Sequence, residues 1–115
     1  MMAVSMVSRV KRGADLLDEQ LPDWYKRIDT AELQMERYDR CILGQTFKDW
    51  LSPEGGGSYL RGLRALGIQE GSGHRYGFDL DHAHDEDDSS YGTLARYWSR
   101  AIGRRLIRDG KRLTG

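Results

Sequence analysis

The single cysteine and the three histidines are the residues of this chain best suited to covalent or metal chemistry. Cys41 lies in the stretch RCILGQTF at 40–47, and the histidines are at positions 74, 82 and 84. A cysteine thiolate beside a histidine base can act as a nucleophile, but one cysteine cannot form an intrachain disulfide or a thiolate zinc site. Because the residues around Cys41 are typical of a helix face, we predict that Cys41 packs in the core as a small hydrophobic residue.

An acidic segment, DLDHAHDEDD at 79–88, carries two of the histidines and six carboxylates. A calcium-binding EF-hand loop needs ligands at fixed positions, and the match fails after the first two. A His-x-His pair can bind zinc or nickel from a strand, although no third ligand stands at a recognised spacing. We therefore predict a solvated acidic loop and no metal or other cofactor. The alternative kept open is a metal-dependent enzyme built on Asp79, Asp81, His82 and His84.

Arginines recur along the last predicted helix, which begins at 91 after a capping serine and ends near 108. Its apolar stripe consists of Leu94, Trp98, Ile102 and Leu106. A second stripe, offset by two residues or about 200° of rotation, consists of Arg96, Arg100, Arg104 and Arg108. Together with Arg105, these side chains are the candidate contacts to a partner or to nucleic-acid phosphates. No aromatic side chain is expected among the arginines on the exposed face, which disfavours single-strand binding. The alternative is a solvated face, paired with the acidic loop.

Hydrophobic periodicity predicts the elements that position these residues. A first helix is expected over 2–21, with one apolar face made of Val7, Val10, Ala14, Leu17 and Leu21. A short turn at 22–28, a second substantial helix within 37–51 and a short helix at 59–68 follow, and Gly67 is placed to end the last of these in a left-handed conformation. Residues 52–58 and 80–90 are predicted to be mobile loops, and 109–115 a C-terminal tail. The prediction is one mainly α domain over 1–115, with three or four main helices and short connecting helices.

The predicted core joins aromatic and aliphatic residues from the elements that follow the first helix. Its members are Trp24, Leu43, Phe47, Trp50, Leu63, Trp98 and Ile102. A glycine inside a helical pattern costs roughly 1 kcal/mol against alanine, so we predict that Gly44 permits a close helix crossing. We also predict that Gln45, if it is buried, forms hydrogen bonds with nearby loop backbone, because an unpaired buried amide is costly.

Composition excludes several classes of protein. Hydrophobic residues make up 38% of the 115 residues and charged residues 31%, which is too apolar for a disordered chain and too polar for a membrane protein. Eighteen basic and eighteen acidic residues give zero net charge, which argues against a dedicated nucleic-acid coat. The sequence contains no phosphate-binding loop, no dinucleotide fingerprint, no H-E-x-x-H and no G-x-S-x-G. An enzyme is therefore the weaker hypothesis, and we expect a cytoplasmic protein.

Five short motifs resemble a group of small proteins from actinobacteria and their phages. The motifs are GADLLDEQLPDWYKRID at 13–29, CILGQTF at 41–47, GLRALGI at 62–68, YGFD at 76–79 and LARYWSRAI at 94–102. The group has no established activity, so the resemblance implies no catalytic residue. Its members often have a second cysteine shortly before the Cys-x-Leu-Gly-Gln motif, where this chain has ERYDR. The resemblance thus implies a phage or actinobacterial origin and gives no support to a thiol-pair or metal role for Cys41.

Taken together, these patterns favour a non-enzymatic accessory protein that binds another protein. If the chain is phage-encoded, that partner would be a host protein in the host cytoplasm. The first alternative is a nucleic-acid-binding protein that uses the C-terminal arginines, and the second is the metal-dependent enzyme described above. No association with a membrane is expected, because the longest apolar runs are only a few residues long.

Overall fold

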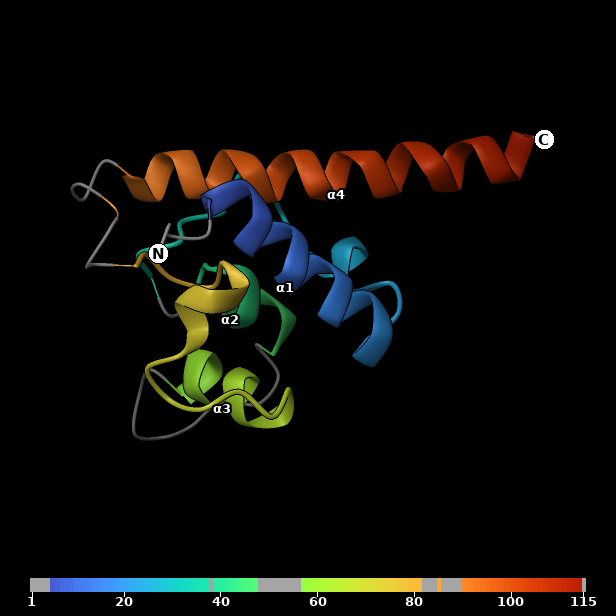
Figure 1. Ribbon diagram of the computed structural model, residues 1–115. Helices are drawn as coiled ribbons and strands as arrows, with labels where there is room; N and C mark the ends of the chain where they lie inside the picture. The colour runs from blue at the N-terminus through green and yellow to red at the C-terminus, as the bar shows by residue number, and fades with distance from the viewer. Residues whose placement is uncertain (1–4, 38, 48–56, 82–84, 86–89, 115) are drawn as a thin grey trace.

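The computed structural model describes residues 5–37, 39–47, 57–81, 85 and 90–114, and within them the chain is mainly helical and has no strand. Its elements are α1 (Met6–Gln20), η1 (Trp24–Arg27), α2 (Ile42–Thr46), α3 (Gly57–Ala65), η2 (Gly73–Tyr76) and α4 (Ser90–Thr114), where η denotes a 3-10 turn. The long helix α4 lies along one edge of the molecule, α1 lies against it, and α2 and α3 lie progressively farther from α4 (Figure 1). The predicted mainly helical fold class is confirmed.

Helix α1 buries the face that the sequence predicted, with one exception. Ser5 caps the helix, since its hydroxyl accepts a hydrogen bond from the Ser8 backbone N–H at 3.2 Å. Val10, Ala14 and Leu17 are buried, whereas Val7 is 52% exposed. The predicted apolar face is therefore not buried along its whole length. Val7 lies in the first turn of α1, where the helix borders an open groove instead of the core.

Helix α2 is much shorter than predicted at its N-terminal end. Within the described residues it begins at Ile42, not at 37, because the Arg37 carbonyl accepts hydrogen bonds from the N–H groups of Arg40 and Cys41 in a turn. Cys41 has extended backbone angles and caps the helix through its sulfur, which accepts from the Gly44 N–H at 3.2 Å. The side-chain cap and the preceding turn together fix where the helix starts. Residues 48–51 of the predicted helix lie outside the described residues.

Helix α3 packs on α2 through a glycine and ends at a second one. A Cβ on Gly62 would stand 2.9 Å from the Phe47 ring and 3.0 Å from the Leu43 Cβ, so only glycine permits this approach. Gly67 has a φ of +75°, and the Ile68 N–H donates to the Leu63 carbonyl at 2.8 Å, which closes a Schellman motif. The predicted left-handed end at Gly67 is confirmed. Residues 57 and 58, which the sequence placed in a loop, already belong to α3.

Helix α4 continues past its predicted end at 108 and runs to Thr114, so most of the predicted tail is helical. The predicted phase is confirmed, because Trp98 is fully buried and Arg100 is exposed. Leu106, however, is 48% exposed and does not continue the buried stripe. The contacts of this part of α4 with α1 and η1 are made by Arg105, Arg108 and Asp109 instead, and the helix extends beyond the other helices after them (Figure 1).

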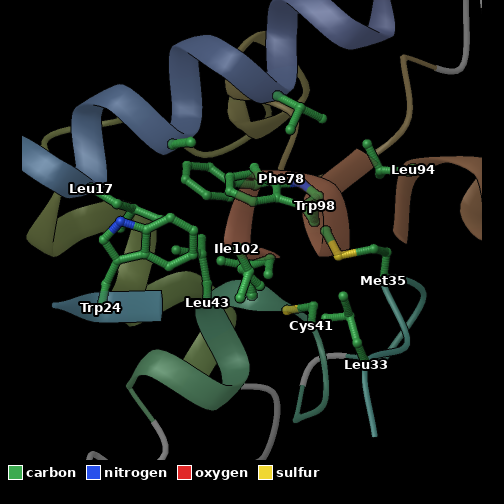
Figure 2. Packing of buried hydrophobic residues seen from close by; sticks show 14 of the residues in the cluster. Leu17, Trp24, Leu33, Met35, Cys41, Leu43, Phe78, Leu94, Trp98 and Ile102 are labelled. Atoms are coloured by element: carbon green, nitrogen blue, oxygen red, sulfur yellow. The ribbon is translucent and has the colours of Figure 1, made fainter. Parts of the chain in front are cut away.

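Trp98 is at the centre of the core (Figure 2). Its ring stacks on Phe78 with centroids 5.4 Å apart and meets Trp24 edge-on at 5.7 Å. Its indole N–H donates to the Gly77 carbonyl at 2.6 Å, which satisfies the only polar group of this side chain. The predicted core residues found buried are Trp24, Leu43, Phe47, Leu63, Trp98 and Ile102. The remaining one, Trp50, lies outside the described residues.

Cys41 and Gln45 both behave as the sequence predicted. Cys41 is buried beside Leu33 (Figure 2), and burial raises the pKa of its thiol to about 11. The buried Gln45 amide accepts from the Asp29 N–H at 2.6 Å and donates to the carbonyls of Asp29 and Arg40 at 3.2 and 3.0 Å. These three bonds tie the connection after η1 to α2. Gly44 is buried, but its role in a close helix crossing stays a prediction.

Candidate functional site

The acidic segment is partly anchored in the fold. One carboxylate oxygen of Asp79 accepts from the Leu80 N–H at 2.8 Å and from the Tyr91 hydroxyl at 2.9 Å. Among the described residues no three histidine, cysteine or acidic side chains come together as a metal site would require. His82 and His84, the other two members of the candidate metal set, lie outside the described residues.

Asp85 forms a buried ion pair with Arg9 of α1. Two guanidinium nitrogens donate to the two carboxylate oxygens at 2.8 and 3.2 Å, and the side chains are only 5% and 9% exposed. Asp85 also accepts a hydrogen bond from the Asp81 N–H at 2.7 Å. No local pattern in the sequence singles out Arg9. The suggested pairing of the acidic segment with the α4 arginines is not seen for Asp85, which pairs with α1 instead.

Arg105 of α4 is held within the fold and is therefore a poor candidate for a partner contact. Its guanidinium donates to both oxygens of Asp18 at 2.7 to 3.2 Å and lies 5.7 Å from the centre of the Trp24 ring. The Trp24 indole N–H donates to the same carboxylate at 2.9 Å. Partial burial acts to raise the pKa of Asp18, but the hydrogen bonds from Arg105 and Trp24 outweigh it and hold that pKa below its ordinary value.

Arg108 is engaged with η1. It donates to the Tyr25 hydroxyl at 3.2 Å, and that hydroxyl donates to the carboxylate of Asp109. The bond between Tyr25 and Asp109 raises the pKa of the phenol and lowers the pKa of the carboxyl. These contacts attach α4 to η1 just before the helix leaves the body of the molecule, which gives Arg108 a structural role.

The remaining arginines of the stripe, Arg96, Arg100 and Arg104, are exposed. In the described part of the chain none of the three has a carboxylate within ion-pair distance. The guanidinium of Arg100 lies over the Tyr97 ring, 5.8 Å from its centre. The expectation that no aromatic stands among the exposed arginines is therefore wrong, because the half-buried Tyr97 reaches the edge of the stripe.

A groove of about 370 Å³ separates the first turns of α1 from the middle of α4. The apolar part of its lining consists of Val7, Val10, Ala14 and Ala101. The charged and aromatic part of the lining consists of Lys11, Asp15, Tyr97, Arg100, Arg104 and Arg105. Arg96 and Arg108 do not line it. The groove thus brings together three of the predicted contact arginines, Arg100, Arg104 and Arg105, with part of the apolar face of α1.

Some of the charged side chains that line the groove already form ion pairs, and others do not do so within the described residues. Lys11 pairs with Asp15 at 2.7 Å in an exposed i,i+4 pair, and Arg105 is engaged by Asp18 as described. The arginines at 100 and 104 therefore provide the uncompensated positive charge. Because the groove is formed by two helices distant in sequence, periodicity alone could not place Val7 or Lys11 beside these arginines.

Comparison of the chain with protein-family models, with curated proteins and with solved structures gives no match. Over the described residues, no helix combines the length and the apolar content needed to cross a bilayer.

Proposed function

We propose that this chain is a non-enzymatic accessory protein that binds a segment of another protein in the α1–α4 groove. The observation that supports the proposal is the groove lining, where Val7 is half exposed beside Arg100 and Arg104, which pair with no carboxylate of the described residues. Covering an exposed aliphatic side chain with a partner is favourable, because it removes apolar surface from water. Charged groups at the edge of such a contact set its specificity. If the chain is phage-encoded, the partner is a host protein and the complex forms in the host cytoplasm.

The experiment compares the proteins retained by immobilised wild-type chain and by the groove variant Val7→Glu/Arg104→Glu. Actinobacterial lysate is the source, and quantitative mass spectrometry is the readout. Arg61→Glu is the matched control, because Arg61 is exposed on α3 and does not line the groove. We expect a stoichiometric partner with the wild type and the control that the groove variant loses. Retention of the same proteins by all three chains, or no partner at all, would contradict the proposal.

Nucleic-acid binding is the second candidate, and the row of exposed arginines at 96, 100 and 104 supports it. Phosphate contacts predict an affinity that falls with rising salt and with charge reversal. A salt titration of DNA and RNA binding by the wild type and by Arg100→Glu/Arg104→Glu tests this candidate. Absence of binding by both proteins at low salt would remove it.

A further inference from the structure

We infer that the α1–α4 groove takes an acidic amphipathic helix, a partner segment with an apolar face flanked by carboxylates. This inference rests on the proposed function and specifies the chemistry of the segment. It follows from the shape of the groove, its apolar lining and the sign of its unpaired charges.

The shape favours a helix. Proteins commonly bind peptides by adding a strand to a sheet edge or by accepting a helix in a groove between helices. The described part of this chain has no strand to offer an edge, whereas α1 and α4 border a groove. A cavity of about 150 Å³ holds a benzene-sized group, so the 370 Å³ of this groove fits roughly two side chains of leucine size. A helix presents two such side chains one turn apart.

The apolar lining indicates what enters. Val10, Ala14 and Ala101 are buried at the base of the groove, and Val7 stands 52% exposed at its border. A ligand bound only through charge would leave Val7 in water. Leucine-like side chains from a partner helix would cover Val7 and contact the alanines, which are small enough to leave them room.

The unpaired charges indicate what flanks the apolar face. Arg100 and Arg104 are one helical turn apart on α4, and both reach the groove. Carboxylates three or four residues apart on the bound helix match this spacing. Lys11 and Arg105 are already paired with Asp15 and Asp18. Arg100 and Arg104 therefore favour a partner segment of negative charge.

The groove is less suited to a nucleic-acid strand. The apolar base of the groove offers phosphates no hydrogen-bond donor. Arg96 separates the two modes of binding. A phosphate chain following the arginine stripe would use Arg96 together with Arg100 and Arg104, whereas a helix seated in the groove would not reach Arg96, which does not line it.

The test is fluorescence anisotropy with the full chain and a labelled, end-capped helical peptide. The probe carries leucines at i, i+4 and i+7, with glutamates flanking them. Its controls have lysine for glutamate or serine for leucine, and a single-stranded DNA oligonucleotide is titrated in parallel. We expect the acidic leucine peptide to bind best, more weakly at high salt, and Arg100→Glu/Arg104→Glu to lose roughly tenfold or more in affinity, because like charges would then face each other. Arg96→Glu is the matched control and should change the affinity less than about twofold.

Helical circular dichroism and thermal melting verify that each variant is folded, and Arg100→Gln/Arg104→Gln replaces the reversal if that variant is destabilised. Equal binding of the lysine peptide, equal loss with Arg96→Glu, or preference for DNA over every peptide would overturn the inference. Dimerisation of the chain alone that the double variant abolishes would assign the groove to a second copy and overturn it as well. If no probe binds but the lysate partner is still lost with Val7→Glu/Arg104→Glu, the acidic helix is refuted and the proposed function survives.

Discussion

The carboxylate of Asp18 joins α1, η1 and α4, and its removal should weaken the fold measurably. Asp18→Ala leaves the indole N–H of Trp24 unpaired in a side chain that is 1% exposed. An unsatisfied buried donor costs about 1–3 kcal/mol. The bonds from Arg105 add less than a fully buried pair would, because Asp18 is 35% and Arg105 13% exposed, so we discount them to about 1 kcal/mol. We expect the free energy of unfolding to fall by about 2–4 kcal/mol in total.

Urea unfolding followed by tryptophan fluorescence measures this change, since Trp24 and Trp98 are both buried. Asp18→Asn keeps an acceptor for the indole and should cost only about 1 kcal/mol, the difference between a charge-assisted and a neutral hydrogen bond. Lys11→Ala is the control, because it breaks only the exposed pair with Asp15 and should cost less than about 0.5 kcal/mol. An Asp18→Ala effect no larger than that of Lys11→Ala would refute the reasoning.

The remaining predictions concern acid stability, a close packing point, the buried ion pair and the thiol. The pKa of Asp18 is lower in the folded state than in the unfolded chain. The stabilisation that ionised Asp18 provides is therefore fully present at pH values above its unfolded-state pKa, and it is lost as the pH falls through its folded-state pKa. The stability gap between wild type and Asp18→Asn should therefore shrink below about pH 4, and a constant gap contradicts this. Gly13→Ala should cost at least about 2 kcal/mol in urea unfolding, since its Cβ would overlap the last carbonyl of η2. Gly103→Ala, which meets only open space, should be neutral or stabilising by up to about 1 kcal/mol. Asp85→Asn should lower the free energy of unfolding by about 3 kcal/mol in the same assay, because it leaves a buried guanidinium without its carboxylate. A free energy of unfolding within about 0.5 kcal/mol of the wild-type value would contradict this prediction. Cys41, with a pKa of about 11, should resist thiol reagents at neutral pH until urea unfolds the chain, and rapid labelling of the folded protein would show that it is accessible.

Local sequence patterns predicted the helices best where one face is buried along its whole length. Val10, Ala14 and Leu17 follow the period of an α-helix, and the structure buries all three. The same period failed for Val7 and Leu106, because Val7 borders the groove and the contacts of α4 near Leu106 are made by its charged neighbours Arg105 and Arg108. Periodicity reports which face of a helix is apolar, but it does not report whether another element lies opposite that face.

The start of α2 shows a second limit. The apolar spacing from Leu43 to Phe47 suits a longer helix, yet the turn over 37–41 and the sulfur cap at Cys41 begin the helix at Ile42. Cysteine is not among the usual capping residues, so the residue type at position 41 did not indicate a helix cap. Gln45 was predictable, since a buried amide in this setting must find hydrogen-bond partners.

The sequence by itself determined the helical class, the burial of Trp24 and Trp98, and the exposed position of Arg100, because these depend on hydrophobic periods within single helices. Only the tertiary structure decided which charges are paired. Arg9 meets a carboxylate 76 residues away and Arg105 meets one 87 residues away. Such pairs follow from how the helices are placed against one another, which also leaves Arg100 and Arg104 unpaired at the border of the α1–α4 groove.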